Sequence, residues 1–565
     1  MAELLAPLPS QITARGVQDK HLSGLATLLM LGLGLLFVVL PVWALLQRSL
    51  WTADGAWLGL SLFAQYLETP SLLDSAWRSL RLSALSAVVC VALAYVYAFA
   101  LTQTQMRAKG FFRAVALLPL LAPSLLMAIS LVYLFGNQGL IKGLLPGGIY
   151  GETGIVIGSV LWTFPHALLV LLTSLSTLDG RLPEAARTLG AGPWRIFWTV
   201  TVPASRYGLM MALVVVFVLV ITDFGVAKVI GGQANVLATD LYRQVVGQQN
   251  FGMGAVVSVW LLLPAVGAFF MERHFRRRQA ASLGARASVF QPRSHALRDN
   301  TLLVVCGLMA LVLVAVIVVA VFASLATYWP YNLAPCFKNY DFDNMDGGGW
   351  ATYGNSLRLA AMVALVGTAA AFASAWLVEK PRHHSALREA LNLVLALPLA
   401  VPGLALGLGY ILFFNTPGNP LQGLYASMAI LVICTVVHFF SVAHLTLLAA
   451  LRQLDREFEL VAESLGVPAW QTLWRVHLPV CLPALLQVAG FFFVNAMTTV
   501  SAVVFLYAPH TQLASVAVLN MDDAGDVAPA AAMAVLIFLT SATVRGLFAL
   551  ASHFALQRTQ AWRQR

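Results

Sequence analysis

Asp223, in the stretch Thr222-Asp223-Phe224-Gly225, is the only carboxylate that we place inside a predicted membrane-spanning segment. A charged side chain at mid-membrane costs on the order of 3 kcal/mol or more, so groups of this kind face water or a partner. We therefore expect Asp223 to face an aqueous path or a binding partner. The alternative is a structural role, either a hydrogen bond or an ion pair with Lys228 on the same segment.

A run of small and hydroxyl side chains interrupts another bulky apolar segment, Asn495 to Val503. Such side chains permit close helix packing, and they can also donate hydrogen bonds to an anionic solute. Helix packing is the commoner reason for such a run, and contact with a solute is the alternative. The polar members that we take as candidates for a translocation path are Asn495, Thr498, Thr499 and Ser501.

The sequence lacks the patterns that are typical of catalysis or metal binding. No Gly-x-x-x-x-Gly-Lys-[Ser/Thr] phosphate-binding loop occurs, and no Ser/His/Asp or Cys/His arrangement stands out. The five cysteines have neither paired nor metal-like spacing, and the acidic stretch 341–347 does not fit a calcium loop. The sequence therefore predicts no catalytic residue, no metal site and no cofactor held by this chain.

A loop motif occurs twice, once in each half of the chain. Both copies place apolar and charged residues at near-helical spacing, end that run at a glycine, and continue to Val-x-[Val/Leu]-Pro. This pattern predicts a short helix that is stopped by glycine. Its members are Glu184, Ala185, Ala186, Gly190 and Pro203 in the loop 178–207, and Glu459, Ala462, Gly466 and Pro479 in the loop 452–482.

The composition requires a membrane. Of the 565 residues, 59% are apolar and 10% are charged, which is more apolar surface than a soluble core could bury. The net charge of +10 is scattered over short loops between apolar runs, as is usual for cytoplasmic loop ends. We therefore expect a polytopic protein in contact with lipid, and no binding to nucleic acid.

Twelve apolar segments are long enough to cross about 30 Å of hydrocarbon. They fall into two sets of six, and a basic linker, residues 273–300, divides them. The expected spans are 24–47, 80–103, 114–135, 154–177, 208–231 and 252–271, followed by 301–327, 357–378, 390–414, 423–450, 483–507 and 527–550.

The two sets are repeats, which predicts an all-α fold of two parallel six-helix halves, residues 1–272 and 301–565. Ser79-Leu80-Arg81-Leu82 recurs as Ser356-Leu357-Arg358-Leu359. Six spans bring the chain back to its starting side, so both halves enter the membrane in the same direction. With both termini in the cytoplasm, Lys and Arg gather on the cytoplasmic side, as the positive-inside rule requires. Both loop copies then face the cytoplasm.

The paired loops resemble the EAA loop of binding-protein-dependent ABC importer permeases of type I. That resemblance implies two coupling helices that contact a cytoplasmic ABC ATPase dimer, a periplasmic solute-binding protein, and one fused permease chain per complex in the bacterial inner membrane. ATP and Mg²⁺ would be used by the ATPase. The fifth span would line the translocation route, where the Asp223 carboxylate could meet an ammonium group or a cation. The alternative is that the loops are interfacial segments without a partner.

The second loop departs from the family pattern, because Leu460-Val461-Ala462 replaces Glu-Ala-Ala. We therefore carry the family's acidic contact onto Glu184 only and keep Glu459 as a candidate.

For the solute, the chain looks most like the 2-aminoethylphosphonate permeases, which are related to the fused ferric-iron permeases. The similar stretches are 222–225, 241–243 and 497–503. The alternatives are a ferric-iron or polyamine permease and, in a different class, a secondary transporter driven by an ion gradient. A secondary transporter would carry several ionisable residues within its spans, whereas Asp223 stands almost alone.

Overall fold

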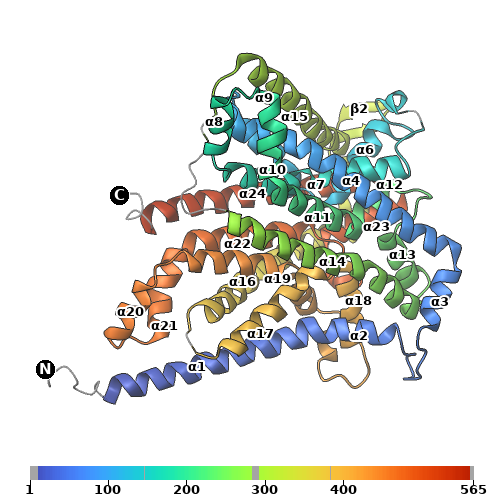
Figure 1. The fold of residues 1–565 in the computed structure, drawn as a ribbon. Coiled ribbons are helices and arrows are strands. Elements are labelled where there is room, and N and C mark those ends of the chain that lie inside the picture. The colour runs from blue at the N-terminus through green and yellow to red at the C-terminus, as the bar shows by residue number, and fades with distance from the viewer. Residues whose placement is uncertain (1–9, 146, 283–289, 291, 382, 560–565) are drawn as a thin grey trace.

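The computed structural model describes residues 10–145, 147–282, 290, 292–381 and 383–559, and these residues are almost entirely helical (Figure 1). Within them, nine helices are long and apolar enough to cross a membrane, or up to twelve spans exist if each of three bent helix pairs counts as one. The expected all-α polytopic membrane fold is thereby confirmed. The nine are Asp19–Arg48, Pro70–Gln103, Glu152–Ser176, Phe251–Phe275, Ala296–Leu325, Gly349–Glu379, Met428–Arg452, Ala469–Thr498 and Val527–Arg558.

Two predicted spans, 114–135 and 390–414, are sharply bent and not straight. The helical segments Lys109–Leu121 and Ser124–Phe135 meet at 102°, and Ser385–Ala400 and Gly403–Phe414 meet at 112°. Pro123 and Pro402 stand at the two breaks. A proline disfavours the α conformation in the residue before it, so one helix ends there and a new one begins. The elements are α5 (Lys109–Ala116), η3 (Leu118–Leu121), α6 (Ser124–Phe135), α17 (Ser385–Ala396), η9 (Leu397–Ala400) and α18 (Gly403–Phe414).

The fifth and eleventh predicted spans, 208–231 and 483–507, end earlier than expected. Their long helices stop at Thr222 and Thr498, and the chain then forms turns and short helices. In the first half the side chain of Asp223 takes part in this break, as described below. The elements are α11 (Arg206–Thr222), α12 (Gly225–Ile230), α13 (Leu237–Tyr242), α22 (Leu478–Thr498) and α23 (Ala514–Ala524).

The repeated Ser-Leu-Arg-Leu motif has the same structural role in both halves. Ser79 on α4 (Pro70–Gln103) accepts a hydrogen bond from the backbone N–H of Leu237 at 2.7 Å. Ser356 on α16 (Gly349–Glu379) accepts one from the backbone N–H of Ala514 at 2.8 Å. Both serines are buried. Each half therefore ties a short helix, α13 or α23, to the start of a long one by the same hydrogen bond.

The first helix of each half packs against the other half. The segment α1 (Ser10–Gly34), η2 (Leu35–Val39) and α2 (Leu40–Arg48) lies along α16, α17 and α18, and the Tyr410 hydroxyl donates to the Phe37 carbonyl at 2.7 Å. In return, α15 (Ala296–Leu325) packs on α4, α5 and α6. It contributes Cys306, Ala310 and Leu313 to the core of the first half. The predicted boundaries thus divide the sequence into two repeats, but the first helix of each repeat packs against the other repeat.

The predicted linker, 273–300, is described only in part, because residues 283–289 and 291 lie outside the described residues. The preceding helix, α14 (Phe251–Ser282), extends well into it. Near the end of the linker, the Pro292 carbonyl accepts a hydrogen bond from the Gln105 side chain at 2.8 Å. Its Phe290 lies beside Gly180, at the start of the first loop motif.

The remaining elements complete the bundle without forming a sheet of more than two strands among the described residues. They are α3 (Ser61–Glu68), η4 (Lys142–Leu144), α7 (Glu152–Ser176), α8 (Arg181–Thr188), α9 (Pro193–Ile196), η5 (Phe197–Thr201), α10 (Val202–Ala204), η6 (Arg243–Gly247), β1 (Ala326–Tyr328), β2 (Asn332–Pro335), η7 (Lys338–Tyr340), η8 (Phe342–Asn344), η10 (Gln422–Leu424), α19 (Met428–Arg452), α20 (Glu457–Ser464), α21 (Ala469–Thr472), η11 (Leu473–His477), η12 (Pro509–Thr511) and α24 (Val527–Thr559).

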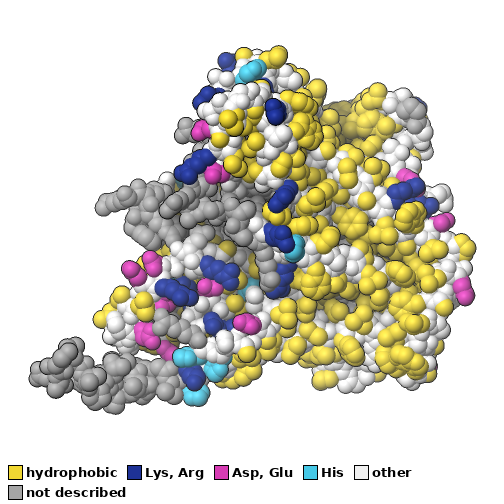
Figure 2. Space-filling view, viewed as in Figure 1, with side chains coloured by type: hydrophobic (Ala, Val, Ile, Leu, Met, Phe, Trp, Pro, Cys, Tyr) yellow, Lys and Arg dark blue, Asp and Glu magenta, His cyan; other side chains and the backbone are white. Residues whose placement is uncertain are grey.

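The surface divides into an apolar middle and charged ends. Figure 2 shows hydrophobic side chains over a broad central area, while most Lys, Arg, Asp and Glu gather at the left end and a smaller set lies at the right edge. Large side chains on the long helices are exposed, among them Leu25, Leu311 and Leu365. An apolar area of this extent is what a helix bundle presents to lipid.

Candidate coupling and translocation sites

The first loop motif forms a helix, a left-handed turn and a second helix. α8 ends at Thr188, and Gly190 adopts φ +79°, a conformation that glycine tolerates and other residues rarely adopt. The N–H of Ala191 then donates to the Ala186 carbonyl at 3.0 Å, which closes the helix end. Glu184 and Ala185 are exposed on α8, and Ala186 is half-buried.

The second loop motif has the same geometry. α20 ends at Ser464, Gly466 adopts φ +64°, and the N–H of Val467 donates to the Ala462 carbonyl at 2.9 Å. Figure 1 shows α8 and α9 at the same side of the molecule as α20 and α21. We call this side the coupling end, and the opposite side, with α3, α13 and β2, the far end. The two motifs thus project in the same direction from a single chain.

Large apolar side chains on both motifs face outward at the coupling end. Leu189 and Leu465, which precede the two glycines, are 87% and 72% exposed. We define the coupling patches as the exposed apolar residues of the two motifs. A helix that projects beyond a bundle and exposes such residues can lie in a groove of a partner. The patches consist of Leu182, Leu189, Trp194 and Trp198 in the first motif, and of Leu460, Val461, Leu465, Trp470 and Trp474 in the second.

The two motifs differ in how they are attached to the membrane helices. Glu459 Oε1 lies 2.6 Å from Lys380 Nζ and 2.9 Å from His477 Nε2. The Trp376 indole N–H donates to His477 Nδ1 at 3.1 Å. Since the indole nitrogen can only donate, Nδ1 accepts, and Nε2 carries the proton that is donated to Glu459. We call Glu459, Lys380, His477 and Trp376 the α20 clasp.

The clasp turns Glu459 inward. When the motifs are aligned on Gly190 and Gly466, Glu459 matches Pro183, and Leu460 matches Glu184. Burial opposes the charge of Glu459, but the hydrogen bond and the positive charge of Lys380 outweigh it, so the pKa of Glu459 lies below its usual value. Glu459 is therefore ionised at neutral pH and engaged within the chain, and its direct contact with a partner stays a prediction.

Asp223 lies in the break between α11 and α12. Its carboxylate accepts a hydrogen bond from the backbone N–H of Val226 at 2.9 Å, so it caps the start of α12. The side chain is half-buried and borders a small cavity with the hydroxyls of Ser83 and Ser159. Lys228 pairs instead with Asp523, at 2.9 Å. The Asp223 carboxylate also has hydrogen bonds with the Ser124 side chain and the Gly225 backbone. These bonds agree with the structural alternative, and contact with a solute stays a prediction.

Polar side chains in the eleventh span form hydrogen bonds with backbone carbonyls of their own helix. Asn495 donates to the Phe491 carbonyl at 2.8 Å, and Thr498 donates to the Val494 carbonyl at 3.0 Å. The backbone carbonyl of Thr499 accepts from Ser515 at 2.6 Å, and Ser501 is half-buried against the start of α18. These bonds agree with a packing role, and the solute role of the four residues stays a prediction.

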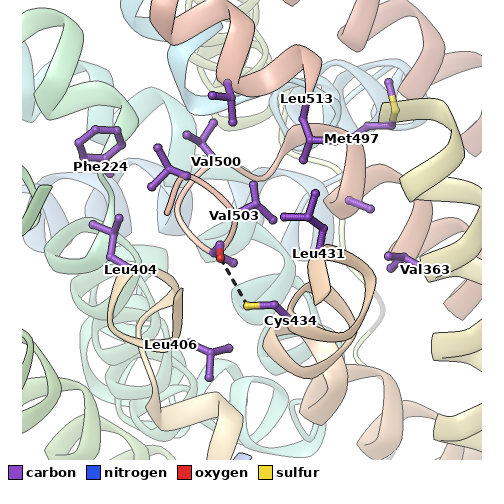
Figure 3. Packing of buried hydrophobic residues seen from close by; sticks show 14 of the residues in the cluster. Phe224, Val363, Leu404, Leu406, Leu431, Cys434, Met497, Val500, Val503 and Leu513 are labelled. Carbon is purple, nitrogen blue, oxygen red and sulfur yellow. Dashed lines mark hydrogen bonds between the residues drawn. The ribbon is translucent and has the colours of Figure 1, made fainter. Parts of the chain in front are cut away.

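Around this run the two halves share one apolar core. Figure 3 shows Val500 and Val503 beside Leu404 and Leu431 of the second half, with Phe224 of the first half nearby. All of these residues belong to one buried cluster. The Cys434 thiol donates to the Ala502 carbonyl at 3.4 Å, which anchors the turn that follows α22. The turns after Asp223 and Thr499 are therefore embedded in the contact between the halves.

The sequence did not reveal the ion pair between Lys228 on α12 and Asp523 on α23. The only available signal in the sequence is the acidic pair Asp522-Asp523. Tyr242 and Phe505, also from different halves, stack with ring centroids 6.2 Å apart. At the opposite end, a cavity of about 780 Å³ lies mostly among second-half residues and borders the first half. It is lined by Thr173 of the first half and by second-half residues that include Val442, Thr446, Gln453 and Gln487.

The two halves of the chain each match one known protein family. The family of binding-protein-dependent transport system inner membrane components matches residues 91–281 and residues 366–553, which together are more than half of the chain. The chain belongs to this family. It is a fused two-half permease subunit of an ABC importer, a multi-pass inner-membrane protein that works with an ATPase and a solute-binding protein and is not itself an enzyme.

Relatives of several named specificities resemble the chain. The ferric transport system permease protein FbpB of Actinobacillus pleuropneumoniae is 25% identical over 79% of this chain and 66% of its own length. The Fe(3+)-transport system permease protein FbpB 2 of Haemophilus influenzae is 22% identical over 86% and 91%. The molybdenum transport system permease protein ModB of Mycobacterium tuberculosis is 28% identical over 42% and 87%.

Among solved structures, a bacterial ABC transporter involved in the import of the acidic polysaccharide alginate matches 43% of this chain and 91% of its own chain. The TM-score is 0.36 and the identity is 16%.

Proposed function

We propose that α8 and α20 are the coupling helices of this importer and that the coupling end faces the cytoplasm, with both termini on that side. One chain then supplies both contacts for an ATPase dimer, and the ATPase binds the ATP and Mg²⁺. The observation that carries this proposal is the pair of helix–glycine–helix motifs at one end, each with an exposed coupling patch. The contact residues are Glu184, Ala185, Ala186, Gly190 and Pro203, with Glu459, Ala462, Gly466 and Pro479.

We further propose that the solute is 2-aminoethylphosphonate. This molecule carries an anionic phosphonate and an ammonium group. The far end offers groups of both signs close together, because Lys228 lies against Asp523 and next to Asp522. A path that contains both charges suits a zwitterion better than an ion of one sign.

Ferric iron is the second candidate. It is supported by the names of two relatives that match most of this chain, both of which are ferric transport permeases. A polyamine is a third candidate, since the spermidine/putrescine permease PotB of Haemophilus influenzae is 26% identical over 40% of the chain. Carboxylates such as Asp223 and Asp522 would suit either cation.

The test is reconstitution of the full chain in liposomes with the ATPase and the solute-binding protein of its complex. We expect uptake of 2-aminoethylphosphonate that requires both partners and ATP, and calorimetry should show that the binding protein holds this solute. If the system binds and imports only ferric iron, or only a polyamine, that ion replaces 2-aminoethylphosphonate as the proposed solute. Uptake driven by an ion gradient, without the ATPase, would overturn the proposed coupling.

A further inference from the structure

The ion pair between Lys228 and Asp523 lies at the far end, in a contact between the halves. Lys228 Nζ is 2.9 Å from Asp523 Oδ1, and the side chains are 26% and 44% exposed. The ammonium also lies 5.6 Å from the centroid of the Tyr242 ring, within the range of a cation–π contact. Asp522 is the neighbouring acid and is half-buried. Water and small solutes can therefore reach a group that holds one positive and two negative side chains.

Each charge is fixed to its own half. Lys228 lies on α12, which begins at the Asp223 cap, and the following helix α13 is bonded to Ser79 of α4. Asp523 lies on α23, which is bonded to Ser356 of α16 at its start. Lys228 thus moves with the first half and Asp523 with the second. The stacked rings of Tyr242 and Phe505 join the halves in the same way.

These contacts join the halves at the far end, whereas a cavity is present at the coupling end. The cavity of about 780 Å³ is lined by residues near the loop motifs, such as Leu454, three residues before α20 begins, and Val480, directly after Pro479. The ion pair and the ring stack lie near the short helices of the far end. If the halves part at the far end to admit solute, these two contacts must break.

We propose that Lys228 and Asp523 form a latch that holds the far end closed, and that their charges, together with Asp522, receive a small zwitterionic solute when the latch opens. This proposal rests on the importer function proposed above. An opened latch leaves an ammonium and two carboxylates without their partners. An anion would compensate only Lys228 and a cation only the acids, whereas a molecule with an anionic group and an ammonium group compensates both.

The titration of Asp522 agrees with this role. Burial and the charge of Asp523 raise the pKa of Asp522 to about 6, against the opposing effect of Lys228. Tyr133 and Tyr150 of the first half also face this acid. Separation of the halves takes Lys228 away, so a solute ammonium would replace the positive charge that favours the ionised form.

The latch is tested by the ATPase activity of the permease–ATPase complex in nanodiscs, without the binding protein. A latch that restrains the resting state predicts that Lys228→Gln and Asp523→Asn each raise this activity several-fold. The exchange variant Lys228→Asp with Asp523→Lys should return it toward the wild-type rate. A loss of folding would lower the activity, so a rise reports release of a restraint.

Glu152→Gln is the matched control, since it removes ion pairs with Arg78 and Arg81 that are also outside the coupling end but lie within the first half. We expect no rise with this variant. Activities of Lys228→Gln and Asp523→Asn equal to that of Glu152→Gln, or no recovery in the exchange variant, would overturn the latch.

The solute part is tested by uptake of 2-aminoethylphosphonate in the complete reconstituted system. Asp522→Asn should lower uptake about tenfold, whereas Asp526→Asn, at the start of α24, should leave it unchanged. Equal uptake by the two variants would overturn the assignment of Asp522 as a solute contact. If the wild-type system imports only ferric iron, the zwitterion is excluded while the latch result stands. If it needs no ATPase, the importer function itself fails.

Discussion

Lys380 Nζ lies 2.6 Å from Glu459 Oε1, at the point where α20 meets the end of α16. The Lys380 side chain is only 7% exposed and that of Glu459 is 22% exposed. His477 and Trp376 complete the α20 clasp. The first motif has Pro183 at the position of Glu459 and no such carboxylate. α20 is thereby fastened to a membrane helix, and displacement of one requires displacement of the other.

We predict that Lys380→Met and Glu459→Gln each loosen α20 without unfolding the bundle. Removal of one partner from a buried ion pair costs up to about 3 to 5 kcal/mol, and the partial exposure of Glu459 places the expected loss below that range. Hydrogen exchange measured by mass spectrometry should show faster exchange in α20. The ratio of ATP hydrolysed to solute imported should rise.

Arg452→Gln is the control for the clasp. Arg452 pairs with Glu379 at 3.0 Å, but the arginine side chain is 60% exposed. Exposed pairs contribute about 0 to 1 kcal/mol, so exchange in α20 should stay near the wild-type rate. A response equal to that of Lys380→Met would show that the clasp has no special role.

The clasp also predicts an acid limit. Because the pKa of Glu459 is lowered in the folded protein, its stabilising effect is fully present above the unfolded glutamate value of about 4.3. The effect is lost as the pH falls through the lower folded value. Exchange in α20, corrected for the intrinsic rate, should therefore be constant at neutral pH and increase only below about pH 4. In Glu459→Gln this acid transition should be absent.

Glu184→Ala should uncouple the ATPase from transport. The carboxylate is exposed on α8, so it is available to a cation of the partner, and its loss should leave the permease folded in the membrane. We expect reduced co-purification of the ATPase and uptake lowered several-fold. Glu68→Ala is the control, because Glu68 is an exposed glutamate on α3 at the far end. Unchanged uptake in Glu184→Ala would contradict the proposed contact.

Gly190→Ala and Gly466→Ala should strain the two turns. Both glycines have left-handed φ values, and no atom lies within 4 Å of a Cβ added at Gly190. The cost is therefore conformational, about 1 to 2 kcal/mol. It should appear as faster hydrogen exchange in the last turns of α8 and α20. Gly192→Ala, at φ −69° with open space around it, should show no such change.

Gly409→Ala should weaken the exchanged packing of α2 and α18. A Cβ at this position would lie 2.6 Å from the Pro41 carbonyl oxygen, and backbone atoms must move to relieve that contact. Overpacking of this kind costs about 1 to 3 kcal/mol, so the Tm in detergent should fall. Gly32→Ala is the control, because Gly32 lies on α1 with open space around it. This variant should leave the Tm unchanged. Equal Tm values for the two variants would refute a tight contact here.

The sequence predicted the repeats and the ends of the two loop-motif helices, because those depend on local signals. Gly190 and Gly466 mark helix ends by their conformational freedom, and the repeated Ser79 and Ser356 have matching hydrogen bonds. It predicted spans at 114–135 and 390–414 but not the sharp bend within each of them. Hydropathy reports the length of an apolar run and says nothing of its direction, although Pro123 and Pro402 were visible as possible breaks.

Contacts between distant segments could not be predicted. The pairing of Lys228 with Asp523, and of Lys380 with Glu459, joins residues that are far apart in sequence. Their choice of partner depends on the packing of whole helices and not on spacing. The exchange of the first helices between the halves is of the same kind, since each apolar run would suit either neighbour equally well.

That exchange has a consequence for how the protein is made. The packing of the first half is complete only after α15 has been synthesised, which follows synthesis of the linker. The contact between α2 and α18 forms later still, because α18 comes after α15 in the chain. Until then, the helices that were synthesised earlier have faces in the bilayer that no other helix covers. Because both halves belong to one polypeptide, each molecule contains one copy of α15 for the first half and one copy of α2 for the second. Assembly therefore needs no association with a second subunit.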